Sequence, residues 1–353
     1  MISLLYVIQV FFKNGCADWR RTDTVDRLRG SVMRTDNATL DETRPRSWRR
    51  LLHQPHRLAD FTVRGFASDP PELRARLETA AGTFLDGFNA GLDAPAGAPP
   101  RFGDQPDHLR GFAVEGLAMQ AALLDLLVPG SRRLPVVLRL HGPAHIHLIH
   151  VGVGWAMAKL RWPFWARLSG LDPLLRWLAL DGWGFSAGFF ADAGGLRRIT
   201  AHPRRCSERC AIRYQGVGRS LWFRGTAEPT RVADLVATLP QWHHGDAWSG
   251  VGLAAAYAGG VSPEGLATLR ERAGAHAGDL GQGVAFAAAA WQRSGWTPPE
   301  LATTVHALTG TDPRTAADWT REAEAGLRTP ATGPVEYQTW RQRIRARVLL
   351  ASL

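Results

Sequence analysis

The chain has 353 residues, of which 45% are hydrophobic, and this is enough for one or two domains with a large buried core. Its net charge is +10, yet 40 of its 42 basic residues are arginines, and most are scattered along the chain. A nucleic-acid-binding protein concentrates positive charge on one face, so we expect no nucleic-acid partner. Three cysteines are too few for a framework of disulfides, and we expect a cytoplasmic protein.

Residues 1–45 differ from the rest of the chain. They begin with an apolar run, ISLLYVIQVFF, which is too short to cross a bilayer and lacks the features of a secretory signal. The charged residues that follow show no helical period. We expect 1–45 to be a non-native or disordered extension. No later segment predicts a stable membrane span, because the longest uncharged run contains four histidines.

The remaining chain divides into three parts. We expect an N-terminal helical segment at 46–91, a helical domain at 107–330 and a C-terminal helix at 335–353, with a Pro- and Gly-rich linker at 92–106. Helix starts are indicated where a short polar residue precedes proline. The five such positions are Asp69, Asp172, Ser262, Thr297 and Asp312. Helix ends are indicated at Gly182, Gly274 and Gly310.

A Gly-x-Gly pattern recurs five times, at steps of 30, 34, 34 and 31 residues. The pairs are Gly152/Gly154, Gly182/Gly184, Gly216/Gly218, Gly250/Gly252 and Gly281/Gly283. Small and aromatic residues follow each pair. Counted from the second glycine, aromatic residues fall at +1 (Trp155 and Phe185) and at +5 (Phe189, Phe223 and Tyr257). Positions four apart share one face of a helix.

One interpretation of Gly250-x-Gly252 is a dinucleotide-binding loop, which requires a preceding strand. The preceding segment instead has Val232, Leu235, Val236 and Leu239 at helical spacing. Glycine inside a helix costs roughly 1 kcal/mol relative to alanine, so its recurrence favours close contact between helix backbones. We therefore predict an all-α protein of packed helical hairpins, a solenoid or toroid with a repeat of about 30–34 residues. The alternative is that a Gly- and Ala-rich composition imitates a repeat.

Several segments resemble a known bacterial family. They are GFAVEGLAM, HVGVGWAMAKL, DPLLRWLALDGWGFSAGFF, YQGVGRSLWF, DAWSGVGLAAAYAGG and GQGVAFAAAA, which cover most of residues 60–330. They resemble the UnbL-type enediyne biosynthesis proteins, a family without an assigned activity whose genes lie beside the polyketide synthase that makes the polyene precursor of enediynes. The resemblance implies a role in that pathway or in another pathway of hydrophobic natural products. The resemblance does not identify a cofactor or a catalytic residue, so none is carried over to this chain.

Aromatic residues are the candidate substrate-binding groups, because their faces line apolar pockets and stabilise cations. The chain has 14 tryptophans, several of them near the Gly-x-Gly pairs. The candidate binding residues are Trp155, Trp183, Phe189, Arg219, Trp222, Trp248 and Tyr257. For any single tryptophan the alternative is simple packing in the core.

Ionisable residues in apolar surroundings are the candidate catalytic groups. Glu115, Asp181 and Asp246 each interrupt an apolar context, and a buried carboxyl group with a raised pKa could donate a proton. Both aspartates could instead cap helices, and Arg219 could pair with one of them. His150 is the fourth candidate and ends the pattern H-x-x-x-H-x-H-x-x-H, which contains no carboxylate; we expect no metal site there.

Together with the pathway that the resemblance implies, these features predict a protein that handles a long hydrophobic polyene intermediate of enediyne-type polyketide assembly, either by binding it or by promoting its cyclisation or rearrangement. One alternative is an isoprenoid or terpene cyclase with an aromatic-lined cavity. A second alternative is a non-catalytic helical scaffold for the polyketide synthase. A scaffold would expose its aromatic residues on an open face, whereas an enzyme would enclose them around an acid.

Overall fold

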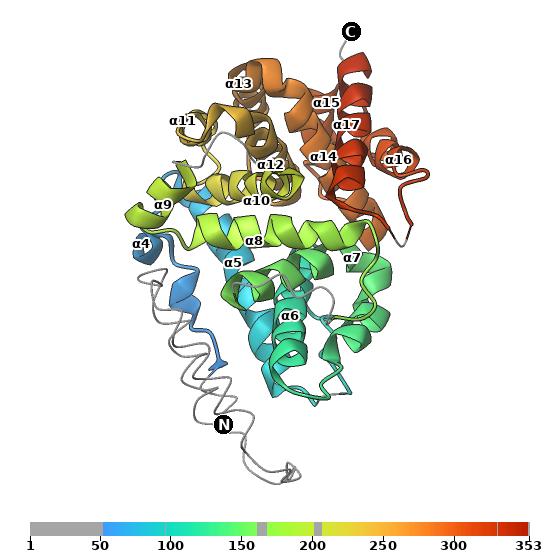
Figure 1. The fold of residues 1–353 in the computed structure, drawn as a ribbon. Helices are drawn as coiled ribbons and strands as arrows, with labels where there is room; N and C mark the ends of the chain where they lie inside the picture. The colour runs from blue at the N-terminus through green and yellow to red at the C-terminus, as the bar shows by residue number, and fades with distance from the viewer. Residues whose placement is uncertain (1–51, 96, 161–167, 201–206, 330, 352–353) are drawn as a thin grey trace.

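The computed structural model describes residues 52–95, 97–160, 168–200, 207–329 and 331–351. These residues form helices joined by short connections and contain no β-strand (Figure 1). The predicted all-α fold is confirmed. The expected extension at 1–45 lies outside the described residues. Within the described residues, no helix is both long and apolar enough to cross a membrane.

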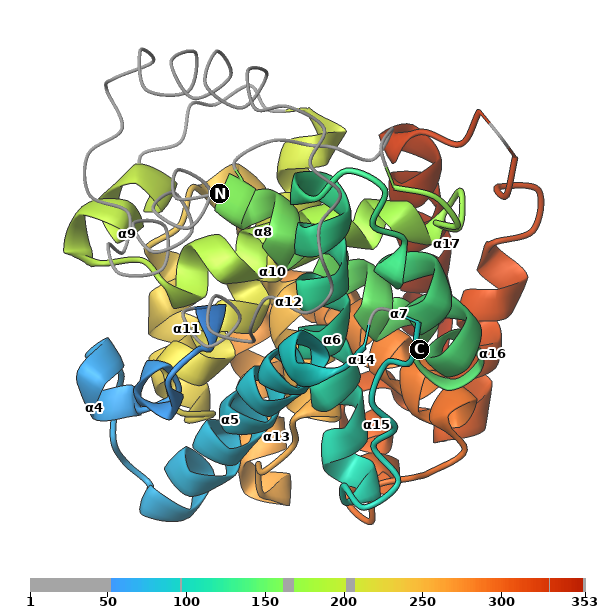
Figure 2. The same cartoon turned by 90° about the horizontal axis from the view of Figure 1, so that it is seen from below.

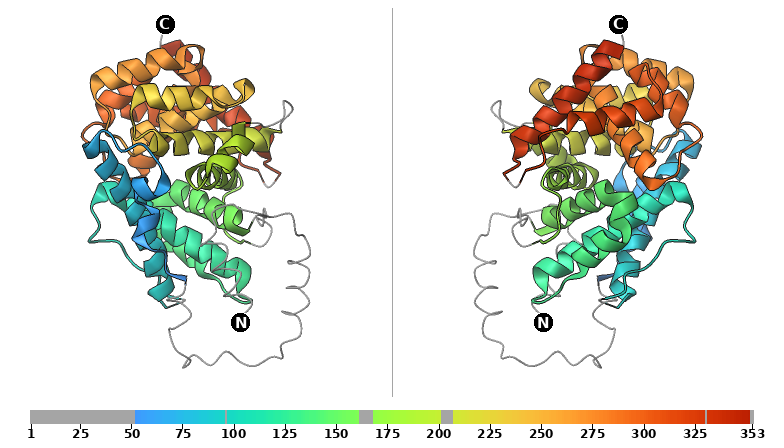
Figure 3. Two further views of the ribbon diagram at one scale, coloured as in Figure 1. Left: turned by 90° about the vertical axis from the view of Figure 1, so that its left-hand side faces the viewer. Right: turned by 90° about the vertical axis from the view of Figure 1, so that its right-hand side faces the viewer.

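Most of the fold is a stack in which each helix packs against the next one along the chain. The stack consists of α5 (Pro71–Asp93), α6 (Asp107–Leu127), α7 (Arg133–Leu160), α8 (Leu178–Phe189), α10 (Glu208–Arg224), α12 (His244–Tyr257) and α14 (Ala277–Ser294). In Figure 3 the N-terminal helices lie at one end of the molecule and the C-terminal helices at the other. Helix α14 also contacts α7, so the stack curves back on itself.

The other helices cover this stack. They are α4 (Phe61–Arg64), α9 (Ala193–Thr200), α11 (Pro229–Ala237), α13 (Pro263–Ala273), α15 (Leu301–Thr309), α16 (Pro313–Ala323) and α17 (Pro334–Ala351), with single 3-10 turns η1 (His56–Leu58), η3 (Leu175–Trp177), η4 (Gln241–His243) and η5 (Gly274–His276). Helix α13 packs against both α11 and α15. Helix α17 packs against α14, α16 and α10 and closes the C-terminal side. Figure 2 shows α5 beside α6 and α10 beside α12.

The glycines of the Gly-x-Gly pairs are the contact points of the stack. At nine of the ten positions, an added Cβ would overlap a backbone carbonyl oxygen of a neighbouring helix. The contacts are Gly152 on Glu115, Gly154 on Ala179, Gly182 on Val151, Gly184 on Arg213, Gly216 on Asp181, Gly218 on Ala247, Gly250 on Gln215, Gly252 on Leu280 and Gly283 on Ser249. The tenth, Gly281, meets the side chain of Val348 on α17. Backbones in such contact gain weak Cα–H···O interactions that any side chain would prevent.

These contacts also show how neighbouring helices are oriented. On α7 and α8, Gly182 lies on Val151 and Gly154 lies on Ala179, so residue numbers rise along one helix as they fall along the other. The two helices are therefore antiparallel, and the glycines fix their register. The same geometry recurs at each junction from α7 to α14. The expected 30–34-residue repeat as a repeated unit stays a prediction.

The predicted helix boundaries have mixed outcomes. Helices α13 and α16 begin at the prolines after Ser262 and Asp312, whose side chains accept hydrogen bonds from the first turn as predicted. Thr297 is not a helix start, because α15 begins only at Leu301. The end predicted at Gly182 is also wrong. Gly182 lies inside α8, where the close approach of α7 requires a residue without a side chain.

The other boundary signals lie close to observed ones. Gly274 and Gly310 follow the last residues of α13 and α15 and have positive φ, as predicted for helix ends. Helix α5 begins at Pro71, two residues after Asp69. Asp172 accepts hydrogen bonds from the backbone N–H groups of Leu174 and Leu175, at the point where the turn η3 begins.

We predict that the glycine contacts determine stability. Gly218→Ala on α10 should lower the free energy of unfolding by about 1–3 kcal/mol, because its Cβ would overlap the Ala247 carbonyl. Gly82→Ala is the control: Gly82 is also buried in a helix, α5, but an added Cβ there makes only an ordinary contact of 3.6 Å with His56. This variant should be neutral or stabilising, since alanine favours the helix. Equal denaturant midpoints for both variants would contradict the role of the contact.

Candidate functional site

One pocket among the described residues, which we call the aromatic pocket, lies between η1, α5, α6, α7, α8 and α10. It contains about 500 Å³ of space, part of it open to solvent. Its aromatic lining is Phe84, Phe112, Trp155, Phe185, Phe189, Phe190 and Phe223, and its ionisable lining is Glu115 and Arg219. The rings pack at angles to one another; for example, the centroids of Trp155 and Phe185 are 5.1 Å apart. Such ring clusters form rigid apolar walls.

A second pocket, which we call the distal pocket, lies on the C-terminal side of the aromatic pocket. It contains about 430 Å³ of space between α7, α8, α10, α12, α14 and α17. Leu253, Tyr257, Phe286 and Trp340 contribute to its lining. Arg219 is the one residue shared between the linings of the two pockets. Its guanidinium group therefore lies where they meet.

The lining follows from the glycine contacts. Where Gly154, Gly184 or Gly218 touches the next helix, the following residue is turned toward the inside of the stack. These residues are Trp155, Phe185 and Arg219, and all three line the aromatic pocket. One turn later, at +5, Phe189 and Phe223 line the aromatic pocket and Tyr257 lines the distal pocket. The sequence pattern had already placed these two positions on one helix face.

Arg219 and Asp181 form a buried ion pair at the centre of the stack. The guanidinium Nη1 of Arg219 on α10 donates to Oδ1 of Asp181 on α8. Asp181 is 0% exposed and Arg219 is 6% exposed. Burial raises the pKa of the Asp181 carboxyl, and the positive charge of Arg219 opposes that rise. The guanidinium carbon also lies 5.0 Å from the centre of the Phe185 ring, a cation–π contact.

Glu115 on α6 is the acid of the aromatic pocket. Its Oε1 accepts a hydrogen bond of 2.9 Å from the indole Nε1–H of Trp155, and its side chain lines the pocket. Burial raises its pKa to about 7, against the opposing effects of Arg219 and the Trp155 hydrogen bond. The carboxyl group is therefore present in both protonated and ionised forms near neutral pH. This is the condition in which a carboxyl group can both donate and recover a proton.

Further polar groups beside the ion pair have incomplete hydrogen bonding. Among the described residues, Oδ2 of Asp181, both side-chain polar atoms of Gln215 and the Tyr337 hydroxyl are buried without a partner in hydrogen-bond geometry. Burial raises the pKa of Tyr337, and the nearby Gln215 amide opposes this rise. Unsatisfied buried polar groups are rare in folded proteins and occur at functional sites. Several such groups lie together at the centre of this stack.

Asp246, the third candidate acid, lies apart from both pocket linings. It accepts a hydrogen bond of 2.9 Å from Nη1 of Arg341 on α17 and lies 3.0 Å from Nδ1 of His243. Arg341 also donates to Gln282 on α14. Asp246 thus joins α12 to the C-terminal helix and lines neither pocket.

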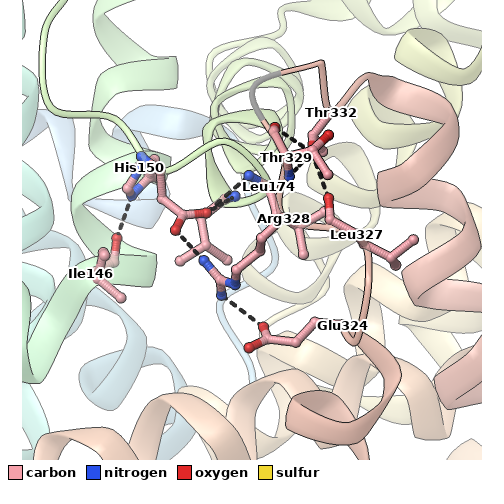
Figure 4. A network of polar contacts seen from close by, with 10 residues as sticks. Ile146, His150, Leu174, Glu324, Leu327, Arg328, Thr329 and Thr332 are labelled. Carbon is pink, nitrogen blue, oxygen red and sulfur yellow. Dashed lines mark hydrogen bonds and ion pairs between the residues drawn. The ribbon is translucent and has the colours of Figure 1, made fainter.

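His150 lies in a second polar network, which connects α7 to the segment before α17 (Figure 4). Its Nδ1 donates to the carbonyl oxygen of Ile146, and its Nε2 accepts from the backbone N–H of Asp172. The Asp172 carboxylate pairs with Arg328, which also binds Glu324. Burial lowers the pKa of His150 to about 4. A neutral imidazole with both nitrogens engaged cannot act as an acid at neutral pH.

The four histidines from His141 to His150 do not form one site. Pro143 lies inside α7, and His145 has non-helical φ and ψ of −132° and 28°. This kink divides α7 between His141 on one side and His147 and His150 on the other. His147 lines the distal pocket, and burial lowers its pKa to about 3. Within the described residues, no group of three His, Cys, Asp or Glu side chains could hold a metal ion.

The remaining binding candidates pack elsewhere. Trp222 is 0% exposed and Trp248 is 4% exposed, but neither lines a pocket. Trp183 is half-buried and lies under the guanidinium group of Arg213 at 4.3 Å. Cys210, near the start of α10, is disulfide-bonded, and both other cysteines lie outside the described residues.

Sequence analysis missed several lining residues as binding candidates. Phe185 and Phe223 were signalled by their +1 and +5 positions. Phe84 and Trp340 come from α5 and α17, which carry no Gly-x-Gly pair, so no periodic signal marked them. Their place in the linings follows only from how the ends of the chain pack onto the stack.

We predict a pH-dependent contribution of Glu115 to stability. Its pKa is about 7 in the folded protein and near 4.5 in the unfolded chain, so the folded state binds more protons between these values. The contribution is fully present below pH 4.5 and is lost as the pH rises through 7. Relative to Glu115→Gln, the wild type should lose about 3 kcal/mol of unfolding free energy between pH 4.5 and 8.

Denaturant unfolding of both proteins across that range measures this difference. His145, His147 and His150 titrate in the opposite direction but are present in both proteins, so their effect cancels. A difference that stays constant with pH would show that Glu115 is not buried in the aromatic pocket.

The comparisons with known proteins place the chain in a family. No curated protein and no solved structure matches it significantly. The model of the family described as "Protein of unknown function (DUF1702)" matches residues 45–348. This range includes both pockets and every candidate residue described above. The chain therefore belongs to this family of proteins of unknown function, DUF1702.

Proposed function

We propose that the protein binds an extended apolar polyene of natural-product assembly in the aromatic and distal pockets and isomerises or cyclises it by proton transfer from Glu115. The observation that carries the proposal is a carboxyl group with a pKa of about 7 among the rings of the aromatic pocket. The resemblance to UnbL-type enediyne proteins supports a polyene as the substrate class. It also supports a cytoplasmic location beside a polyketide synthase.

The dimensions and lining of the pockets support binding of an apolar ligand. Small-molecule sites typically enclose about 300–1,000 Å³ and have mostly apolar walls with a few polar groups. The two pockets, of about 500 Å³ and 430 Å³, lie on either side of Arg219. An elongated chain that passes Arg219 would contact both, with aromatic faces along much of its length.

The proposed reaction conserves all atoms of the substrate. The protonated Glu115 carboxyl donates its proton to one carbon of a double bond, and the π electrons form the new C–H bond. The resulting carbocation lies among aromatic rings, whose negative faces stabilise it. Attack by a second double bond closes a ring, or the cation shifts along the chain. Loss of a proton from carbon back to the Glu115 carboxylate completes an isomerisation that needs no co-reactant.

An isoprenoid cyclase would use the same aromatic pocket and the same acid. Whether the protein converts a polyene or an isoprenoid distinguishes these two functions. A scaffold for a polyketide synthase would instead present its aromatic residues on an open face. Trp155, Trp222 and Trp248 are all buried, at 5%, 0% and 4% exposed. This burial favours an internal ligand over an external partner.

We predict saturable binding of a conjugated polyene. Titration with a fluorescent tetraene ester should quench tryptophan emission, since Trp155 lines the aromatic pocket. Phe223→Leu should weaken binding about twofold to tenfold because it removes one ring of the lining. Phe61→Leu is the control, since Phe61 is equally buried but packs outside the lining. Failure of the wild type to bind any apolar chain would contradict the proposal.

We also predict that Glu115 is required for product but not for binding. A host that carries Glu115→Gln should accumulate the unconverted polyene, identified by mass spectrometry, while the purified variant binds the tetraene normally. Asp246→Asn removes the candidate acid that lies outside both linings and should leave product formation intact. Full product from Glu115→Gln would exclude this carboxyl as the proton donor.

A further inference from the structure

Arg219 retains hydrogen-bonding capacity that the described residues do not use. Its Nη1 donates to Asp181, whereas Nε and Nη2 make no hydrogen bond with any described residue. A guanidinium group has five N–H donors, and buried donors normally have partners. Arg219 is only 6% exposed, and it lines both pockets. Unused donors at this position point to an acceptor that is supplied by the ligand.

The charges around Arg219 indicate what kind of acceptor fits. The positive charge of Arg219 is already balanced by Asp181. The next ion pair, Arg341 with Asp246, is balanced as well. Glu115 carries a negative charge whenever it is ionised. An anionic ligand group would therefore add an uncompensated buried charge, which is far more costly than a neutral acceptor.

The position of Arg219 indicates where along the ligand the acceptor lies. The aromatic pocket lies on one side of the guanidinium group and the distal pocket on the other. Both linings are otherwise mostly apolar and give a chain few other polar partners. Apart from Arg219, the ionisable groups in these linings are Glu115 and His147, so a polar group away from all three would lose its hydrogen bonds to water without replacement.

We propose that Arg219 binds the carbonyl oxygen of a neutral acyl group, such as an ester, thioester or ketone, within a ligand whose apolar segments occupy the pockets. This assignment rests on the proposed function and defines its substrate class. Arg219 is thus the specificity-determining residue, and it positions the chain relative to Glu115. The ion pair with Asp181 holds the guanidinium plane in place for this purpose.

Three matched probes test the assignment. They are the methyl ester of parinaric acid, which is a conjugated tetraene, the free acid, and the hydrocarbon of equal length without the ester group. Affinities are measured by fluorescence on the full chain at pH 8, where the acid is ionised. The ester should bind about tenfold more tightly than the hydrocarbon, and the ionised acid should bind more weakly than the ester.

Two variants separate the role of Arg219 from folding. Asp181→Leu with Arg219→Met replaces the ion pair by apolar groups of similar size, which buried sites often tolerate. It should bind ester and hydrocarbon equally. Arg219→Lys keeps the charge for Asp181 but lacks the planar fork, and it should lose most of the ester preference. Asp246→Leu with Arg341→Met changes a partly buried ion pair away from the aromatic pocket, and this variant should keep the ester preference.

The outcomes are distinguishable. Equal affinity of the wild type for ester and hydrocarbon would overturn the assignment to Arg219 while leaving the proposed polyene binding intact. Tighter binding of the ionised acid than of the ester would show that the site takes an anion instead. Absence of binding to all three probes would overturn the proposed function together with this inference. A tenfold ester preference that disappears in both Arg219 variants supports it.

Discussion

The helices of this protein approach one another until glycine Cα atoms touch backbone carbonyl oxygens, and the rest of the structure depends on this approach. At Gly182 and Gly216 even a methyl group would overlap the neighbouring helix. Because each contact allows only one register, it also fixes the direction of the side chains that follow. Residues directly after the contact, such as Trp155 and Arg219, are turned inward, where they line the pockets.

Close packing at the contacts contrasts with space at the centre. Small residues bring the backbones together, while large rings such as Trp155 and Phe185 hold the walls of the aromatic pocket apart. The polar groups at this centre add little stability, since a buried ion pair seldom repays the loss of its hydration. We therefore propose that Arg219, Asp181 and Glu115 act on a ligand rather than stabilise the fold.

The C-terminal part of the chain contributes side chains to the distal pocket and to the ion pairs around it. Helix α17 contributes Trp340 to the distal pocket and Arg341 to the Asp246 ion pair. The segment before α17 is held to α7 through Asp172 and Arg328, and the backbone N–H of Asp172 donates to Nε2 of His150. The Arg341–Asp246 and Arg328–Asp172 contacts join residues 95 and 156 positions apart in sequence, and they tie the C-terminal part of the chain to α12 and to the segment before α8.

The sequence by itself determined the all-α class, the starts of α13 and α16, and the helix face that carries Phe189, Phe223 and Tyr257, because these follow from caps and from the 3.6-residue period. The acids Glu115 and Asp181 were also visible as charges in apolar segments. Only the tertiary structure decided which of them faces a pocket, that Asp246 and His150 serve structural networks, and that Phe84 and Trp340 join the linings. Those outcomes depend on which helices meet across the stack, and a local pattern carries no information about contacts between distant segments.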